Sequence, residues 1–172
     1  MFPQVLLTLT LAACVYTDLT QRRIYNAVLL PSLLAAVLWH MWDQGWGGIF
    51  AAMVGAVTGL ALLWLPFAAG GLGAGDVKLL ATVGAWLGSA FAVRAALLGA
   101  LVGGALALGT AARQRRLAAV LKDTGRGVAM LVATGGRLNP LPAMGESGPQ
   151  PATIPYGLAL ALGAVMAFFW RW

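Results

Sequence analysis

Six apolar stretches separated by short polar connections make up most of this 172-residue sequence. A helix of about 17–25 mostly apolar residues is needed to cross a bilayer. The six candidates lie near Pro3–Thr17, Ala27–Trp42, Gly48–Pro66, Val77–Phe91, Ala95–Ala112 and Thr153–Trp170. With 60% hydrophobic and 9% charged residues, the composition is far from that of a soluble domain. We therefore predict an all-α integral membrane protein, with residues 1–172 forming one domain as a bundle of six transmembrane helices.

The basic residues predict the orientation of this bundle. Eight of the 11 Lys and Arg residues fall in connections that lie on the same side if the stretches cross in alternation. A ninth, Lys78, is the second residue of the fourth stretch on that side, and the exceptions are Arg94 and Arg171. Because cytoplasmic loops carry the excess of Lys and Arg, we expect both termini outside. Topology also accounts for the net charge of +6, so we expect no nucleic-acid partner. No Lys or Arg precedes the first stretch, so we expect a retained helix and not a secretory signal cleaved near Cys14.

The connection 113–152, between the fifth and sixth stretches, has its own pattern. In its first part apolar residues fall on one helical stripe and basic residues on the other. Such a basic amphipathic helix is expected to lie on anionic lipid headgroups at the cytoplasmic surface. From Asn139 onward, Pro and Gly predict an irregular connection.

Two of the five acidic residues stand at the edges of apolar stretches. Asp18 closes the first stretch, Asp76 opens the fourth, and alternation places both at the cytoplasmic face. Placing a carboxylate at the edge of the hydrocarbon region costs free energy. We therefore interpret each acid first as a functional group with a partner nearby. Singly, Asp76 could instead cap a helix, and Asp18 could pair with Arg22 or Arg23. Both acids on one face favour a catalytic pair.

Two carboxylates that share a proton can hydrolyse a peptide bond without a metal or cofactor. The ionised acid takes a proton from water while the protonated acid donates one to the carbonyl oxygen. Gly73 and Gly75, which precede Asp76, would let an extended substrate strand lie close to the backbone. The single Cys14 and the lone His40 cannot build a zinc site, so we expect no metal.

Small residues recur four apart, which is typical of close helix packing. The pairs are Gly55/Gly59, Gly84/Gly88 and Gly99/Gly103. We expect most of them to pack helices within the bundle, with oligomerisation as the alternative.

The chain resembles the type IV prepilin leader peptidases, a family of Gly-x-Gly-Asp membrane aspartic proteases. Three segments carry the resemblance: Asp18-Leu-Thr-Gln-Arg-Arg-Ile-Tyr-Asn26, Gly73-Ala-Gly-Asp-Val-Lys-Leu-Leu80 and Ile154-Pro-Tyr-Gly157. The resemblance implies removal of a short basic leader from prepilins at the cytoplasmic face of the bacterial inner membrane. It implies that Asp18 and Asp76 are the catalytic acids. The residues it implies in shaping the site are Gly73, Gly75, Lys78, Arg23, Asn26, Pro155 and Tyr156.

Two features depart from many relatives. Tyr25 stands where many relatives have Pro, which bears on the shape of the loop. Bifunctional members carry an extra domain with paired Cys that methylates the new N-terminus, and this sequence has one Cys. We therefore expect a peptidase without methyltransferase activity, similar to the compact enzymes of Flp-type (Tad) pili.

Three other functions stay open at this stage. The first is a presenilin-like or signal-peptide-peptidase-like enzyme, which shares Gly-x-Gly-Asp but usually has more spans. The second is a small proton- or cation-coupled transporter in which Asp18 and Asp76 line the path. The third is a non-catalytic membrane subunit of a secretion or pilus machine, in which the acids only cap helices.

Overall fold

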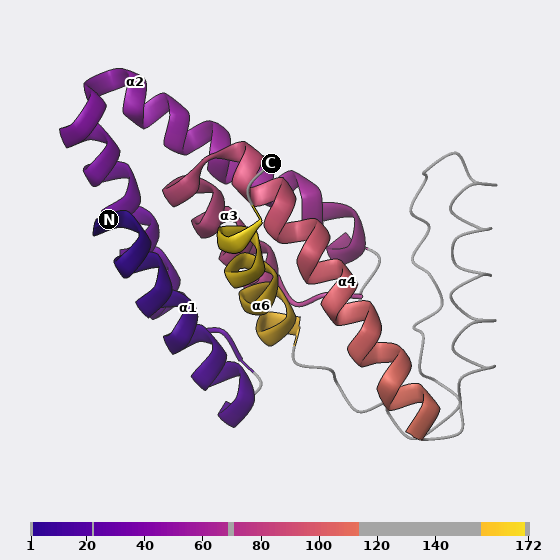
Figure 1. Ribbon diagram of the computed structural model, residues 1–172. Coiled ribbons are helices and arrows are strands. Elements are labelled where there is room, and N and C mark those ends of the chain that lie inside the picture. Colours follow the sequence, from indigo (N-terminus) through magenta and orange to yellow (C-terminus); the bar gives the residue numbers. More distant parts are fainter. Residues whose placement is uncertain (1, 22, 69–70, 114–155, 171–172) are drawn as a thin grey trace.

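The computed structural model describes residues 2–21, 23–68, 71–113 and 156–170, and these residues are helical apart from short connections (Figure 1). The helices are α1 (Phe2–Gln21), α2 (Asn26–Ala68), α3 (Ala74–Leu87), α4 (Ser89–Arg113) and α6 (Tyr156–Phe169). The predicted all-α class is confirmed. The amphipathic helix and loop expected over 113–152 lie outside the described residues, except for Arg113.

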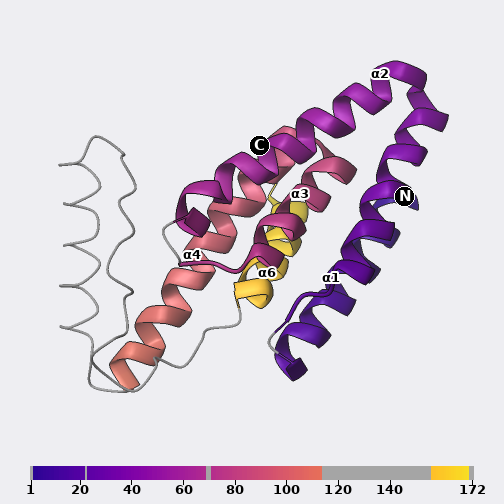
Figure 2. The same ribbon diagram turned by 180° about the vertical axis from the view of Figure 1, so that it is seen from behind.

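Helix α2 is folded back on itself at Gly45. This residue has φ 62° and ψ −140°, a non-helical conformation that residues with a Cβ rarely adopt. Figure 2 shows the ribbon turning sharply there, so that the arms 26–44 and 46–68 run in opposite directions. The second and third apolar stretches of the sequence fall on these two arms.

The boundary between α3 and α4 differs from the sequence prediction. The break lies at Gly88, which has φ 85° and ends α3, and α4 begins at Ser89. The predicted stretch Val77–Phe91 therefore runs too far, and Arg94 lies within α4 and not in a turn. Apolar residues continue through the break, so hydropathy alone could not locate it.

Glycines let two pairs of helices approach closely. A Cβ on Gly55 of α2 would meet the backbone oxygen of Gly84 in α3, and a Cβ on Gly84 would meet that of Gly55. Likewise, a Cβ on Gly163 of α6 would lie 2.6 Å from the Cα of Gly99 in α4. Internal packing is thus confirmed for these glycines. Gly88 has a second role: it caps α3, and a Cβ on it would meet nothing within 4 Å, although its Cα would lie 3.3 Å from a Cβ on Gly55.

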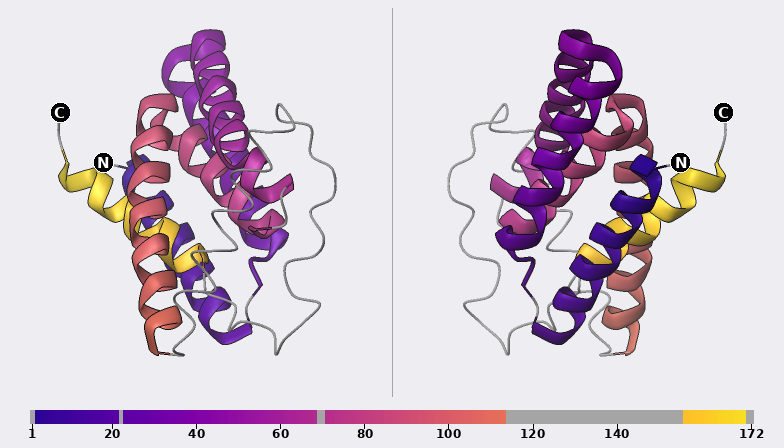
Figure 3. Two further views of the ribbon diagram at one scale, coloured as in Figure 1. Left: turned by 90° about the vertical axis from the view of Figure 1, so that its right-hand side faces the viewer. Right: turned by 90° about the vertical axis from the view of Figure 1, so that its left-hand side faces the viewer.

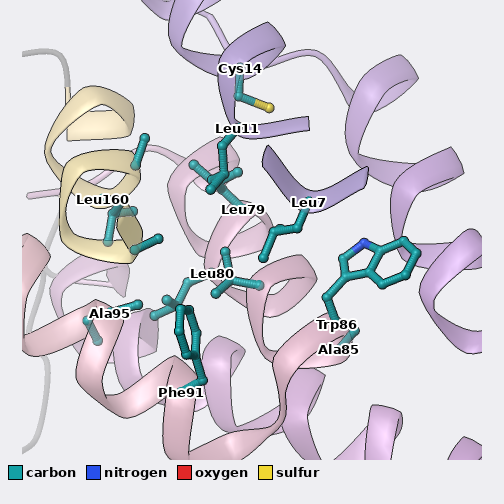
Figure 4. Close-up of a cluster of buried hydrophobic side chains, with 14 of the residues drawn as sticks. Leu7, Leu11, Cys14, Leu79, Leu80, Ala85, Trp86, Phe91, Ala95 and Leu160 are labelled. Atoms are coloured by element: carbon teal, nitrogen blue, oxygen red, sulfur yellow. The ribbon is translucent and has the colours of Figure 1, made fainter. Parts of the chain in front are cut away.

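A buried apolar cluster joins all five described helices, and its members in α2 include Leu29 and Ala36. Figure 4 shows part of it, side chains from α1, α3, α4 and α6, with Leu7 and Leu11 of α1 beside Leu79 of α3. Figure 3 shows α6 crossing against both α1 and α4, which it contacts. The middle of α1, where Leu7, Leu11 and Cys14 belong to this cluster, packs against the other helices.

Three described helices are long and apolar enough to cross a membrane: α1, α2 and α4. Helices α3 and α6 have 14 residues each, about 21 Å at 1.5 Å per residue. That is shorter than a hydrocarbon core of about 30 Å. The structure therefore has several candidate membrane spans.

Candidate active site

Asp18 lies on the buried face of α1. Leu7, Leu11, Cys14 and Asp18 are spaced four, three and four residues apart, which places them on one helical stripe, and all four are buried. The Asp18 side chain is 8% exposed. Its Oδ2 accepts a hydrogen bond from the backbone N–H of Leu158, in the first turn of α6, at 3.3 Å. The carboxylate is thus fixed against the start of α6.

Asp76 lies in the first turn of α3 and is 7% exposed. Its Oδ2 accepts a hydrogen bond from the backbone N–H of Gly73 at 3.1 Å, and its own N–H donates to the Gly73 oxygen at 3.1 Å. This is a capping arrangement, so Asp76 does what the structural reading of the sequence proposed. A carboxylate that caps a helix can still exchange a proton, and the two roles coexist at this position.

The surroundings of Asp76 favour its protonated form. Asp76 precedes the apolar part of α3 and lies outside the three candidate spans. Burial, opposed by the Gly73 N–H and aided by the charge of Asp18, raises the pKa of Asp76 from 3.8 to about 6. A buried acid with a raised pKa keeps its proton to a higher pH than an exposed acid does, which suits Asp76 to proton exchange.

Ile24 lies between the segments that carry the two acids. A Cβ built on Gly75 would lie 2.8 Å from the Cβ of Ile24, and a Cβ on Gly157 would lie 3.0 Å from its Cδ1. The same Cβ on Gly157 would lie 2.7 Å from Oδ2 of Asp18. The space beside Gly75 is therefore filled by Ile24, whereas the sequence suggested that it would receive substrate.

Two of the predicted site-shaping residues are joined to one another. Lys78 Nζ donates a hydrogen bond to Asn26 Oδ1 at 3.0 Å, which ties α3 to the start of α2. Arg23 is exposed. In the described part of the chain Asp18 has no ion pair, so Arg23 does not neutralise it there.

The remaining predicted residues lie at the two helix starts. Gly73 is exposed and precedes α3, with an extended φ of −79° and ψ of 149°. Tyr156 begins α6 and packs against α4, where a Cβ on Gly103 would lie 3.1 Å from its Cζ. Pro155 lies outside the described residues.

Three contributors to this region were missed by the sequence reasoning: Ile24, the close approach at Gly157 and the N–H of Leu158. Ile24 and Gly157 belong to the segments that carry the resemblance, so a signal was present. Their contacts with Gly75 and Asp18 join residues far apart in the chain and are visible only in three dimensions.

Comparison with known proteins assigns the family. The sequence profile of the type IV leader peptidase family matches residues 5–108, which is more than half of the 172 residues and includes both acids. The chain belongs to the type IV leader peptidase family. The predicted resemblance is thus confirmed for α1 to α4, while α6 lies beyond the matched residues.

Curated relatives in this leader peptidase family match part of the chain. A prepilin leader peptidase/N-methyltransferase of Aeromonas hydrophila is 34% identical over 111 residues, which cover 60% of this chain and 38% of the relative. Proteins of the same description from Burkholderia pseudomallei (strain 1026b) and Neisseria gonorrhoeae are 34% and 32% identical over 90 residues. The chain thus spans well under half the length of these relatives. No solved structure matches it.

Proposed function

We propose that this protein is a membrane aspartic endopeptidase that removes the short basic leader of type IV prepilins at the cytoplasmic face of the bacterial inner membrane. Asp18 and Asp76 are its catalytic pair. The observation that carries the proposal is that both acids are buried and that Ile24 lies beside Gly75, which precedes Asp76, and beside Gly157, which lies against Asp18. Family membership and the names of the relatives supply the substrate class.

The roles of the two acids follow from their surroundings. Asp76 holds the shared proton and donates it to the carbonyl oxygen of the peptide bond. Asp18 accepts a proton from the attacking water as the tetrahedral species forms. The exposed backbone at Gly73 is the proposed path for the extended substrate strand, and Arg23, Lys78 and Asn26 shape its cytoplasmic mouth.

The proposed topology has six spans with both termini outside. The two arms of α2 on either side of Gly45 count as two separate crossings. Helices α1, α3, α4 and α6 are the other four. The short helices α3 and α6 then need polar ends that reach into the headgroups. This arrangement places Asp18 and Asp76 on the cytoplasmic side, together with most basic residues.

The product is proposed to keep a free N-terminus, as expected for a Flp-type enzyme. The 172 residues contain only Cys14, which is buried in α1, and so they hold no cysteine pair. Mass spectrometry of the cleaved pilin after incubation with S-adenosylmethionine tests this point. A mass increase equal to one methyl group would contradict it.

The decisive experiment compares prepilin cleavage in membranes for wild type, Asp18→Asn and Asp76→Asn. Asn retains an oxygen that can accept the N–H of Leu158 or Gly73, so both helix starts stay capped. Asn cannot exchange the catalytic proton, and each variant should lose at least about 100-fold in rate. Asp43→Asn, at an exposed acid in α2, is the matched control and should cleave normally. Unchanged cleavage in either active-site variant would reduce that acid to a cap.

A further inference from the structure

A second polar cluster lies inside the protein, away from the two acids. Thr10 Oγ1 of α1 and Ser32 Oγ of α2 are hydrogen-bonded at 2.8 Å, and Trp86 Nε1 of α3 donates to the same Ser32 oxygen at 3.1 Å. Thr10 is 9% exposed and Trp86 is 2% exposed. One serine hydroxyl therefore joins three helices.

The two outer helices of this cluster are the ones that carry the acids. Thr10 and Asp18 are eight residues apart on α1, about 12 Å along the axis, and Trp86 and Asp76 are ten residues apart on α3, about 15 Å. Ser32 joins Thr10 of α1 to Trp86 of α3. Asp18 lies about as far along α1 from this junction as Asp76 lies along α3. The cluster and the acids thus lie at two corresponding levels of the same pair of helices.

Helices α1 and α3 are otherwise joined by apolar contacts, in which Leu7 and Leu11 lie beside Leu79 (Figure 4). Apolar contacts have little directional preference and permit one helix to slide or rotate against another. Hydrogen bonds between helices have a defined geometry, and in a membrane protein they are worth about 1 kcal/mol each. The polar cluster is therefore suited to fix the axial register of α1 on α3.

Helix α2 has further contacts that keep Ser32 in place. His40 Nε2 lies 3.3 Å from the Trp86 carbonyl oxygen, and Asn26 accepts the hydrogen bond from Lys78. The arm 26–44 is thus joined to α3 at three levels. Ser32, on this arm, can act as a fixed point between α3 and α1.

We propose that Ser32, with Thr10 and Trp86, forms a hydrogen-bonded clasp that positions Asp18 against Asp76 for catalysis. Ser32 is a positioning residue and does not touch the substrate. This inference rests on the proposed function, because it assigns the clasp to the catalytic pair. A shift of about 1 Å between reacting groups can cost about 100-fold in rate, so a remote contact that sets helix register has a measurable effect.

The first test measures prepilin cleavage by Ser32→Ala. We expect kcat to fall about tenfold with KM unchanged, because the acids are misplaced while the substrate path stays intact. Ser32→Thr keeps the hydroxyl and should restore most of the rate. The matched control is Thr82→Val, which removes a buried hydroxyl of α3 that bonds only to the Lys78 oxygen of the same helix. Equal losses in Ser32→Ala and Thr82→Val would overturn the clasp.

The second test needs no activity and so separates the clasp from the proposed function. Cysteines introduced by Asp18→Cys and Asp76→Cys, with Cys14→Ala, are cross-linked with a short bis-maleimide in native membranes. The cross-linking rate should fall several-fold when Ser32→Ala is added, and remain unchanged when Thr82→Val is added. An equal rate with and without the Ser32 hydroxyl would overturn the clasp even if Asp18 and Asp76 are catalytic. If Ser32→Ala does not insert, Trp86→Phe removes the indole N–H that donates to Ser32 and keeps an aromatic side chain at this position.

Discussion

The backbone N–H of Leu158 donates a hydrogen bond to Asp18 Oδ2 at 3.3 Å, although the two residues are 140 positions apart. The first N–H groups of a helix have no partner within it, and the helix dipole favours a negative charge there. Asp18 therefore supplies from α1 the acceptor that the start of α6 requires. In return, the position of α6 determines where the Asp18 carboxylate lies.

Gly157→Ala is expected to disturb this arrangement directly. The added Cβ would lie 2.7 Å from Asp18 Oδ2 and 3.0 Å from the Cδ1 of Ile24. Because contacts this short force the carboxylate to move, we expect cleavage to slow by about ten- to 100-fold in a protein that still inserts. Steady-state kinetics of prepilin cleavage would measure the effect.

Gly104→Ala is the control for that substitution. Gly104 lies in α4 and has nothing within 4 Å of an added Cβ, so alanine should be neutral or slightly stabilising. Similar rates for Gly157→Ala and Gly104→Ala would show that the close approach at Asp18 has no catalytic consequence.

The sequence could predict the helices and the two acids because each depends on local composition. Long apolar stretches predict spans wherever they occur, and Asp18 and Asp76 are conspicuous because acids in such surroundings are rare. The sequence indicated that Gly88 packs against another helix, but only its φ of 85° shows that it also ends α3. This limit applies wherever an apolar sequence continues through a break.

Interactions between helices could not be predicted in the same way. Ser32 is an ordinary residue in an apolar stretch, and only the packing of α1 and α3 on either side of it reveals its two hydrogen bonds. Ile24 is equally ordinary in sequence. Their contacts depend on the rotation and axial position of each helix, which hydropathy does not specify.

Gly55→Ala should destabilise the α2–α3 pair. The new methyl group would overlap the Gly84 backbone, which cannot move aside as a flexible side chain could, and such overpacking costs about 1–3 kcal/mol. Gly47→Ala in the same helix meets nothing within 4 Å and is the control. Thermal unfolding in detergent should show a lower Tm for Gly55→Ala alone, and equal Tm values would contradict the close packing.

Gly75→Ala should impair cleavage through Ile24. Its Cβ would lie 2.8 Å from the Cβ of Ile24, so only a residue without a Cβ at position 24 relieves the overlap. We expect that adding Ile24→Gly restores more activity to Gly75→Ala than adding Ile24→Ala does. If Ile24→Gly and Ile24→Ala restored the same cleavage rate to Gly75→Ala, contact with Ile24 would not be the reason that Gly75 is required.

The stability of the protein should depend on pH through Asp76. Its folded-state pKa is raised from 3.8 to about 6 by burial, opposed by the Gly73 N–H and aided by the charge of Asp18. The protonated form is therefore favoured by folding. Its stabilising contribution, at most about 3 kcal/mol, is complete below about pH 4 and is lost as the pH rises through about 6.

Thermal unfolding between pH 4 and pH 7 measures this contribution. Wild type should lose stability as the pH rises across that window, and Asp76→Asn, which does not titrate, should show a smaller slope. Asp43→Asn at an exposed acid should retain the wild-type slope. If Asp76 donates the catalytic proton, cleavage by wild type should also decline above about pH 6, where Asp76 ionises. A slope that Asp76→Asn leaves unchanged would mean that another group titrates, and the assignment of the shared proton to Asp76 would be wrong.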